Sequence, residues 1–184
     1  MRSHHASLVF VLALTTLGGA GQWGEQRAIA AAELRAGAPA KQDESALAAA
    51  RAWLEELAAG DDTQLAAKSK VPFTFGTTAR QKKCDRTAAN EGALASLFKC
   101  IREQEATFVG ELRSAGKLKV RVVNHAHVPR KLAKLVKGHG RQLVSTFVNG
   151  DGISFDVVLA VSPAEAGASP AVGALYVDGE VEAD

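Results

Sequence analysis

The chain has 184 residues, of which 47% are hydrophobic and 23% are charged, and its formal net charge is +2. This balance is typical of a globular chain and excludes collagen-like, disordered and disulfide-scaffold classes. The small net charge does not by itself indicate a nucleic-acid partner, and no internal repeat of fixed period is present.

The first 20 residues predict a cleavable signal peptide. A weakly positive start precedes an apolar run from Ala6 to Leu17, which ends in small residues up to Ala20, the pattern of a secretory signal. The run is shorter than the roughly 20 residues of a membrane-spanning helix. We expect cleavage after Ala20, with Ala30 as the second choice and an uncleaved anchor as the alternative. The expected location is periplasmic or extracellular, with no transmembrane segment after cleavage.

Residues 21–42 are rich in Ala, Gly and polar side chains, so we expect a flexible leader there. Residues 43–184 have the length of a single domain. This part contains the only two cysteines, Cys84 and Cys100. In an oxidising compartment such a pair is expected to form a disulfide; two free thiols or half of a metal site are the alternatives.

The first half of the domain alternates helices with one strand. Apolar residues at helical spacing predict an amphipathic helix over 43–60, followed by a short helix over 61–68. A strand is expected over 71–75, with Pro72 near its start. A polar, basic loop over 76–89 then leads to a third helix, from Asn90 to about Ile101.

The second half is mostly strands. Residues 108–112 are ambiguous between helix and strand, and Pro129 is expected to open a short helix that ends at Gly138. The turn residues 149–152 predict a hairpin. The strands expected here are 117–123, 143–148, 153–161 and 171–177. Helices grouped first and hairpins grouped last predict an α+β fold, in which the helices pack on one face of a curved, mostly antiparallel sheet.

The order of 43–60, Asp61-Asp62 and the strand 71–75 resembles the opening of the nuclear-transport-factor-2-like superfamily, which includes ketosteroid-isomerase-like and SnoaL-like proteins. The resemblance implies a cone-shaped sheet, a pocket between helices and sheet, and frequent homodimers. Isomerases of this superfamily use an acidic base and a tyrosine or acid donor that face the pocket. No such set is placed here, because Tyr176 is the only tyrosine and Asp156 points away from the apolar face of its strand. We therefore assign no catalytic residue.

Six aromatic residues are candidates for lining a pocket for a small apolar ligand, with plain core packing as the alternative. They are Trp53, Phe73, Phe75, Phe108, Phe155 and Tyr176. No Gly-rich phosphate loop or nucleophile motif is present, so no cofactor is expected.

Charge is segregated along the chain. Residues 113–141 hold nine Lys/Arg and no Asp/Glu, whereas residues 142–184 hold seven Asp/Glu and no Lys/Arg. Arg130, Lys134 and Lys137 are expected on one side of the short helix, as a patch for anionic surfaces. Alternatively, the acidic strands offset these charges across the sheet. No aromatic residue interleaves with the basic run, so no nucleic-acid partner is expected.

His125 and His127 lie two residues apart, a spacing that can begin a metal site, but the surrounding charge is positive and surface histidines are the preferred interpretation. No metal is therefore expected. The sequence favours an exported, noncatalytic domain that binds a small apolar ligand or a protein. The alternatives are a small isomerase-like or dehydratase-like enzyme, and a binder of anionic surfaces through residues 113–141.

Overall fold

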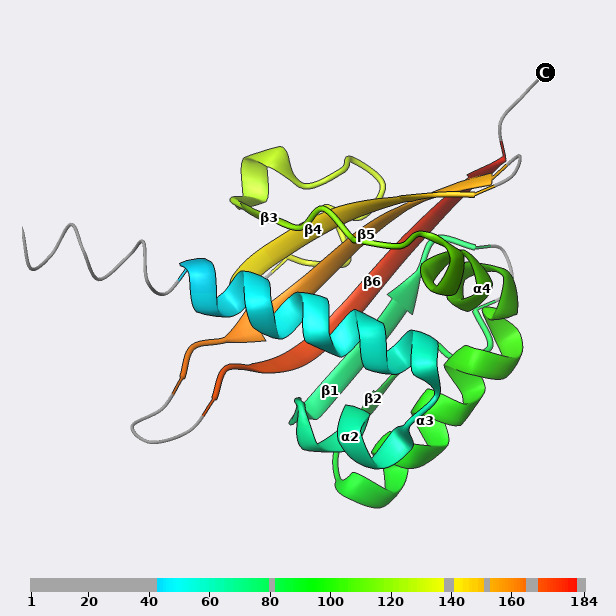
Figure 1. The fold of residues 1–184 in the computed structure, drawn as a ribbon, viewed down its shortest axis with the longest axis vertical. Helices are drawn as coiled ribbons and strands as arrows, with labels where there is room; N and C mark the ends of the chain where they lie inside the picture. Colours follow the sequence, from blue (N-terminus) through cyan, green and yellow to red (C-terminus); the bar gives the residue numbers. More distant parts are fainter. Residues whose placement is uncertain (1–42, 80–81, 138–140, 151–152, 165–168, 182–184) are drawn as a thin grey trace, which may run out of the picture. The chain divides into compact units, whose positions relative to one another are not determined.

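The computed structural model describes residues 43–79, 82–137, 141–150, 153–164 and 169–181 (Figure 1). The signal peptide expected over 1–20 and the leader expected over 21–42 lie outside the described residues, and both stay predictions.

Helices form where the sequence offers capping residues. The helix over 43–59 ends at Gly60, whose φ of 87° suits a residue without a side chain. Helix α2 (Asp62–Ala67) begins after Asp61, whose carboxylate accepts a hydrogen bond from the Gln64 N–H at 3.0 Å.

The third predicted helix is confirmed as α3 (Glu91–Gln104). The Asn90 side chain accepts from the Ala93 N–H at its start, at 2.9 Å. Helix α4 (Ala106–Ser114) follows at once, so the ambiguous residues 108–112 are helical. Phe108, Val109 and Leu112 form its buried side.

The described strands form one six-stranded sheet of order β2-β1-β6-β5-β4-β3. The strands are β1 (Ser69–Thr77), β2 (Arg86–Ala88), β3 (Arg121–Val123), β4 (Gln142–Asn149), β5 (Ile153–Ser162) and β6 (Ala171–Val181). The predicted hairpin is confirmed, because β4 and β5 are antiparallel neighbours. Only the β1–β6 pair is parallel in this sheet, so the sheet is mixed but mostly antiparallel.

Two sequence predictions about strands were wrong in detail. The expected loop over 76–89 contains β2. The expected strand over 117–123 forms ladder bonds only from Arg121. Ahead of it, the Lys119 carbonyl accepts from the Thr146 hydroxyl instead, at 3.0 Å.

The helix expected after Pro129 is also absent, because residues 130–137 form turns. The backbone hydrogen bonds described between Pro129 and Val136 are accepted by the carbonyls of Pro129 and Leu132. They do not form the continuous series of bonds that a helix has. A segment this short forms few helical bonds, and its shape is set by Leu132 and Val136, which pack against the sheet. Gly138 lies outside the described residues.

The sheet bends where β5 and β6 change register. Ala160 pairs with Ala174 and Val161 with Val172, so Gly173 is the extra residue of a bulge. A bulge increases local bend and twist. A Cβ at Gly173 would lie 1.5 Å from Nη1 of Arg141, so glycine here allows that guanidinium to lie directly on the strand.

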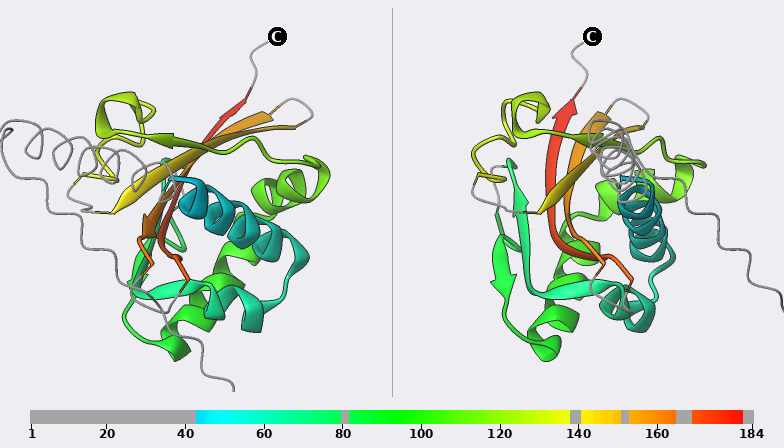
Figure 2. Two further views of the ribbon diagram at one scale, coloured as in Figure 1. Left: turned by 60° about the vertical axis from the view of Figure 1, so that its left-hand side comes forward. Right: turned by 90° about the vertical axis from the view of Figure 1, so that its left-hand side faces the viewer.

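Both faces of the sheet are covered. We call inner the face that packs against the helices, and outer the opposite face. The inner core takes Phe155, Val157 and Leu159 from β5. The outer core takes Val158 and Ala160 from the same strand, with Leu132 and Val136 above them. The segment that covers the outer face and the 43–59 helix lie on opposite sides of β4–β6 (Figure 2).

The predicted disulfide between Cys84 and Cys100 is present, with Cα atoms 5.8 Å apart. It joins the segment before β2 to α3. The Cys84 side chain is fully buried in the inner core.

Candidate functional site

The space between helices and sheet, where a pocket was expected, holds closely packed aromatic rings. Trp53 stacks on Phe73 at 5.5 Å between ring centroids. Phe98 makes T-shaped contacts with both rings, at centroid distances of 5.9 and 5.4 Å. All three side chains have 0% exposure. Phe98 was not among the predicted pocket residues; it lies on the buried side of α3. Such a cluster gains area burial and favourable ring geometry.

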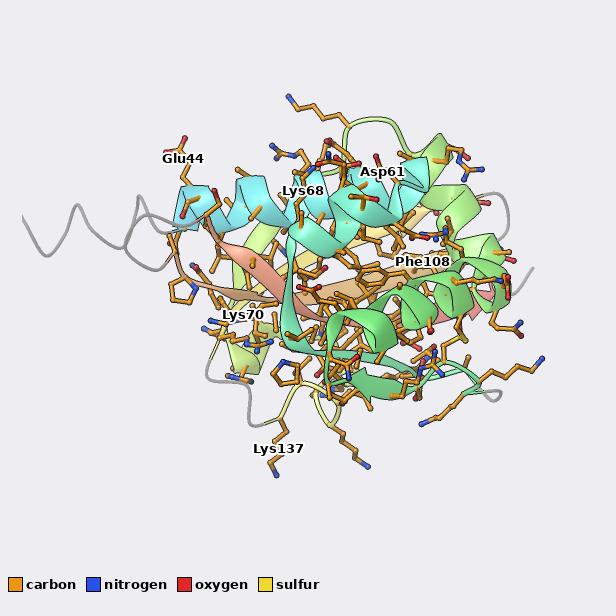
Figure 3. The ribbon with its side chains drawn as sticks, turned by 90° about the horizontal axis from the view of Figure 1, so that it is seen from below. Glu44, Asp61, Lys68, Lys70, Phe108 and Lys137 are labelled. Atoms are coloured by element: carbon orange, nitrogen blue, oxygen red, sulfur yellow. A yellow bond between two sulfur atoms is a disulfide. The ribbon has the colours of Figure 1, made fainter. Side chains whose placement is uncertain are left out.

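The remaining candidates are split between the two faces. Phe75, Phe108 and Phe155 lie in the inner core, where Phe108 and Phe155 approach to 5.4 Å. Figure 3 shows Phe108 enclosed between the helices and the sheet. Tyr176 lies in the outer core, because its side chain alternates with those of Leu175 and Val177. The six residues therefore do not meet around one space, and their assignment as pocket residues stays a prediction.

Tyr176 is buried at 2% exposure beside Gly76, where a Cβ would lie 3.1 Å from its ring. Burial raises the pKa of the Tyr176 hydroxyl to about 12, and the nearby positive charge of Arg141 limits the rise. The hydroxyl is thus neutral and suited to donating a hydrogen bond at ordinary pH.

We expect the phenol of Tyr176 to ionise near pH 12, well above its ordinary range. Since the folded-state pKa is raised, this group stabilises the fold fully below its unfolded pKa of about 10. That stability is lost as the pH rises toward the folded value. Phenolate absorbance measures the ionisation directly, because the chain has a single tyrosine. Arg141→Gln should raise the pKa further; a pKa near 10 in the folded protein would contradict the burial.

A second perturbed group lies where α3 meets α4. Burial, and then the negative charge of Asp85, raise the pKa of Glu105. Asp85 itself accepts a hydrogen bond from the Thr77 N–H at 2.9 Å. The Asp85 hydrogen bond joins the segment that carries Cys84 to β1.

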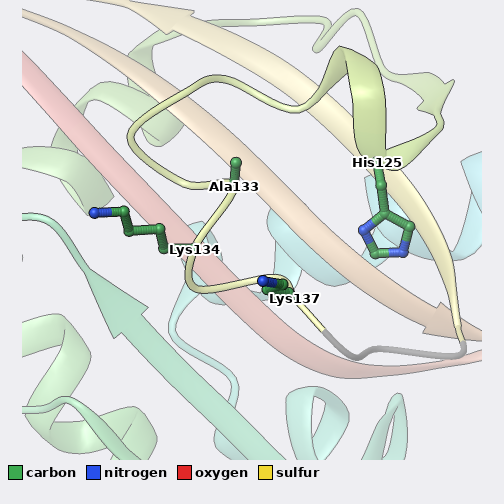
Figure 4. Close-up of a pocket in the computed structure, with 4 residues that line it drawn as sticks. All are labelled: His125, Ala133, Lys134 and Lys137. Carbon is green, nitrogen blue, oxygen red and sulfur yellow. The ribbon is translucent and has the colours of Figure 1, made fainter.

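The basic segment forms an open hollow of about 470 Å³ on the outer side of the sheet, which we call the lysine hollow. Its described lining residues are His125, Ala133, Lys134 and Lys137. His125 comes from the short 3₁₀ helix η1 (His125–His127), and the other three come from the turns after Pro129 (Figure 4). Lys137 projects away from the body of the domain (Figure 3).

A smaller hollow of about 290 Å³, the Phe147 hollow, lies where β3, β4 and β5 run side by side. It is lined by Lys119, Arg121, Ser145, Thr146, Phe147 and Asp156. Phe147 pairs across the ladder with Asp156 and is 57% exposed. Sequence reasoning missed Phe147 because it lies outside the basic run. The alternation of side chains along β4 could have indicated it, because Phe147 lies on the same side of the strand as Leu143 and Ser145, which are buried.

Two basic residues of the segment 113–141 are engaged within the domain. The Arg113 guanidinium donates twice to the Ala58 carbonyl, at 3.1 and 3.0 Å, and so caps the 43–59 helix. Lys131 lies 3.7 Å from the buried carboxylate of Asp178 on β6. The expected offset by the acidic strands is therefore partial. Arg130, Lys134 and Lys137 are exposed.

The two histidines are exposed and belong to η1, not to a continuing strand. Nδ1 of His127 lies 2.6 Å from Oδ1 of Asn124, the residue that caps this turn. Within the described ranges, no group of three or more His, Cys, Asp or Glu side chains is placed to hold a metal ion. No helix in the same part of the chain is long and apolar enough to span a membrane.

Fold and surface together define an α+β domain with helices on the inner face of a bent sheet and a basic segment on the outer face. No family model matches the sequence, and no curated protein matches it. Similar solved structures include a ketosteroid isomerase-like protein from Erwinia carotovora atroseptica SCRI1043. It is 12% identical, with a TM-score of 0.47, over 77% of this chain and 98% of that one.

An NTF2-like protein from Burkholderia xenovorans LB400 is 14% identical, with a TM-score of 0.40, over 75% of this chain and 91% of that one. Both names belong to the superfamily that the sequence resembles. At these identities the likeness concerns the fold alone, and no residue role is taken from either protein.

Proposed function

We propose that this chain is an exported, noncatalytic domain that binds an anionic ligand on the outer face of its sheet. The observation that carries the proposal is the lysine hollow, whose described lining includes His125, Lys134 and Lys137. None of its described lining residues is acidic. A concave surface lined by charge of one sign concentrates ions of the opposite sign and speeds their association.

The turns that carry these side chains are anchored to the sheet. Leu132 has 0% exposure and Val136 has 1% exposure, so both are buried against the outer core. This anchoring limits the backbone motion of the turns that hold Lys134 and Lys137. A basic surface that is held in place loses less entropy when it binds.

The close packing on the inner face also favours the outer face as the binding surface. The small apolar ligand expected from the resemblance would need room between the 43–59 helix and the sheet. Trp53, Phe73 and Phe98 pack in that region. Export is supported by the Cys84–Cys100 disulfide, since disulfides persist mainly in oxidising compartments.

The test uses inorganic polyphosphate, a linear polyanion without rings, titrated into the mature chain. In the patch variant, Arg130, Lys134 and Lys137 are replaced by Gln. A matched control replaces the exposed residues Lys83, Arg86 and Lys99, which removes the same charge elsewhere. Each cation near an anionic surface contributes about 1 kcal/mol, so the patch variant should bind about 100-fold more weakly.

The control should retain nearly all of the affinity, and salt should weaken binding by the parent protein. Equal losses in both triple variants would mean that only net charge matters, and the proposed surface would be wrong. Binding that does not depend on salt would also contradict it.

A further inference from the structure

The turn after β4 begins with a chemically labile pair of residues. Asn149 is the last residue of β4, is exposed, and is followed by Gly150. The backbone nitrogen of the next residue can attack the side-chain amide of an asparagine. A glycine in that place has no side chain to hinder the attack. The sequence therefore puts the least hindered partner directly after Asn149.

The chain has three asparagines, and hydrogen bonds hold the side chains of the other two. Oδ1 of Asn90 accepts from a backbone N–H of α3 at 2.9 Å. Oδ1 of Asn124 accepts from two backbone N–H groups of η1, at 3.1 and 3.2 Å. Both are followed by residues with large side chains, Glu91 and His125. Among the described residues, none forms a hydrogen bond to the side chain of Asn149.

Two contacts restrain Gly150. Its N–H donates to the Ile153 carbonyl at 2.9 Å, and this bond keeps the proton on the nitrogen and fixes its direction. The Glu111 side chain of α4 lies directly over Gly150, because a Cβ there would be 2.2 Å from Cδ of Glu111. The nitrogen can attack only after the turn opens locally. Local opening costs less free energy than global unfolding, so the fold slows the reaction without preventing it.

We propose that Asn149 is a site of spontaneous deamidation whose rate is set by the contacts of Gly150. The Gly150 nitrogen gives its proton to hydroxide and bonds to Cγ of Asn149, and the side-chain nitrogen leaves as ammonia. Water then opens the resulting cyclic imide at either carbonyl, so that position 149 becomes aspartate or isoaspartate. Both products add a negative charge next to the residue that Glu111 covers. Repulsion between the like charges weakens the contact between the turn and α4.

The experiment incubates the folded protein at mildly alkaline pH and follows each asparagine by peptide mass spectrometry. Asn149→Gln is the control, since glutamine must close a larger ring and reacts far more slowly. This variant also separates the signal from Asp151, which precedes a glycine and can isomerise without a change in mass. Glu111→Ala tests the restraint on the turn, with the exposed Glu103 of α3 replaced by alanine as the matched control. Circular dichroism checks that each variant is folded.

We expect Asn149 to convert before Asn90 and Asn124. Its conversion in the folded protein should be about fivefold slower than in the urea-unfolded chain, because one hydrogen bond of ordinary net strength must open first. Glu111→Ala should raise the rate about twofold to fivefold, toward that of the unfolded chain, because the turn then opens more easily. Glu103→Ala should leave the rate unchanged.

Conversion at Asn90 or Asn124 that is as fast as at Asn149 would overturn the inference. A parent-like yield of deamidated protein in Asn149→Gln would also overturn it, because the modified residue would then lie elsewhere. Equal rates in Glu111→Ala and the parent protein would overturn the role assigned to Glu111. None of these results depends on ligand binding at the lysine hollow, so the proposed function is tested separately.

Discussion

Replacing Trp53 with alanine is expected to lower the free energy of unfolding by about 3–5 kcal/mol, the range for large aromatic truncations in a core. Its ring has 0% exposure and contacts both Phe73 and Phe98. Its Nε1 donates to the Ser69 hydroxyl at 2.8 Å, so the variant also removes a hydrogen bond. Urea unfolding, with the m-value held as a check on two-state behaviour, measures the change.

Two matched variants separate the ring from the hydrogen bond. Ser69→Ala should lower the free energy of unfolding by about 1 kcal/mol, the usual net value of one hydrogen bond. The loss in Trp53→Phe should lie between those of Ser69→Ala and Trp53→Ala. A loss below about 1 kcal/mol in Trp53→Ala would mean that the ring is poorly packed in solution. The inner face would then be the open ligand cavity that the superfamily resemblance implies, and the choice of the outer face would lose its support.

Removing the disulfide should have the next largest effect. Cys84 and Cys100 are 16 residues apart, and closing a loop of this length stabilises a fold by about 3 kcal/mol on the chain-entropy model. We expect the double variant Cys84→Ser, Cys100→Ser to unfold at correspondingly lower urea concentration. Urea unfolding of the parent protein without reductant provides the comparison.

Reductant provides the control, because the parent protein treated with dithiothreitol should approach the stability of the double variant, whereas the double variant should not respond to it. If the parent protein keeps its full stability under reducing conditions that cleave the bond, the disulfide contributes little. The argument that places the chain in an oxidising compartment would then be weaker.

Several features were accessible from sequence because they depend on neighbours in the chain. The Asp61 and Asn90 caps, the end of the first helix at Gly60 and the hairpin of β4 and β5 follow from local backbone preferences. The alternation of apolar residues along β5 likewise follows from its sequence, and Phe155, Val157 and Leu159 share one side.

Other features depended on pairing between distant segments. The parallel β1–β6 ladder joins residues about 100 positions apart, and β2 exists because β1 lies beside it. The turns after Pro129 took their shape from the outer core and not from local helix propensity.

The amino-acid sequence alone determined an α+β fold, the position of its main hairpin, its cysteine pair and a basic run without acidic residues. Only the tertiary structure decided which face each aromatic side chain occupies. Alternation within a strand says which residues share a side, but long-range strand pairing decides what that side meets. That pairing separated Tyr176 from the other five aromatic candidates, and it placed Phe147, far along the chain from Lys119 and Arg121, beside them at one edge of the sheet.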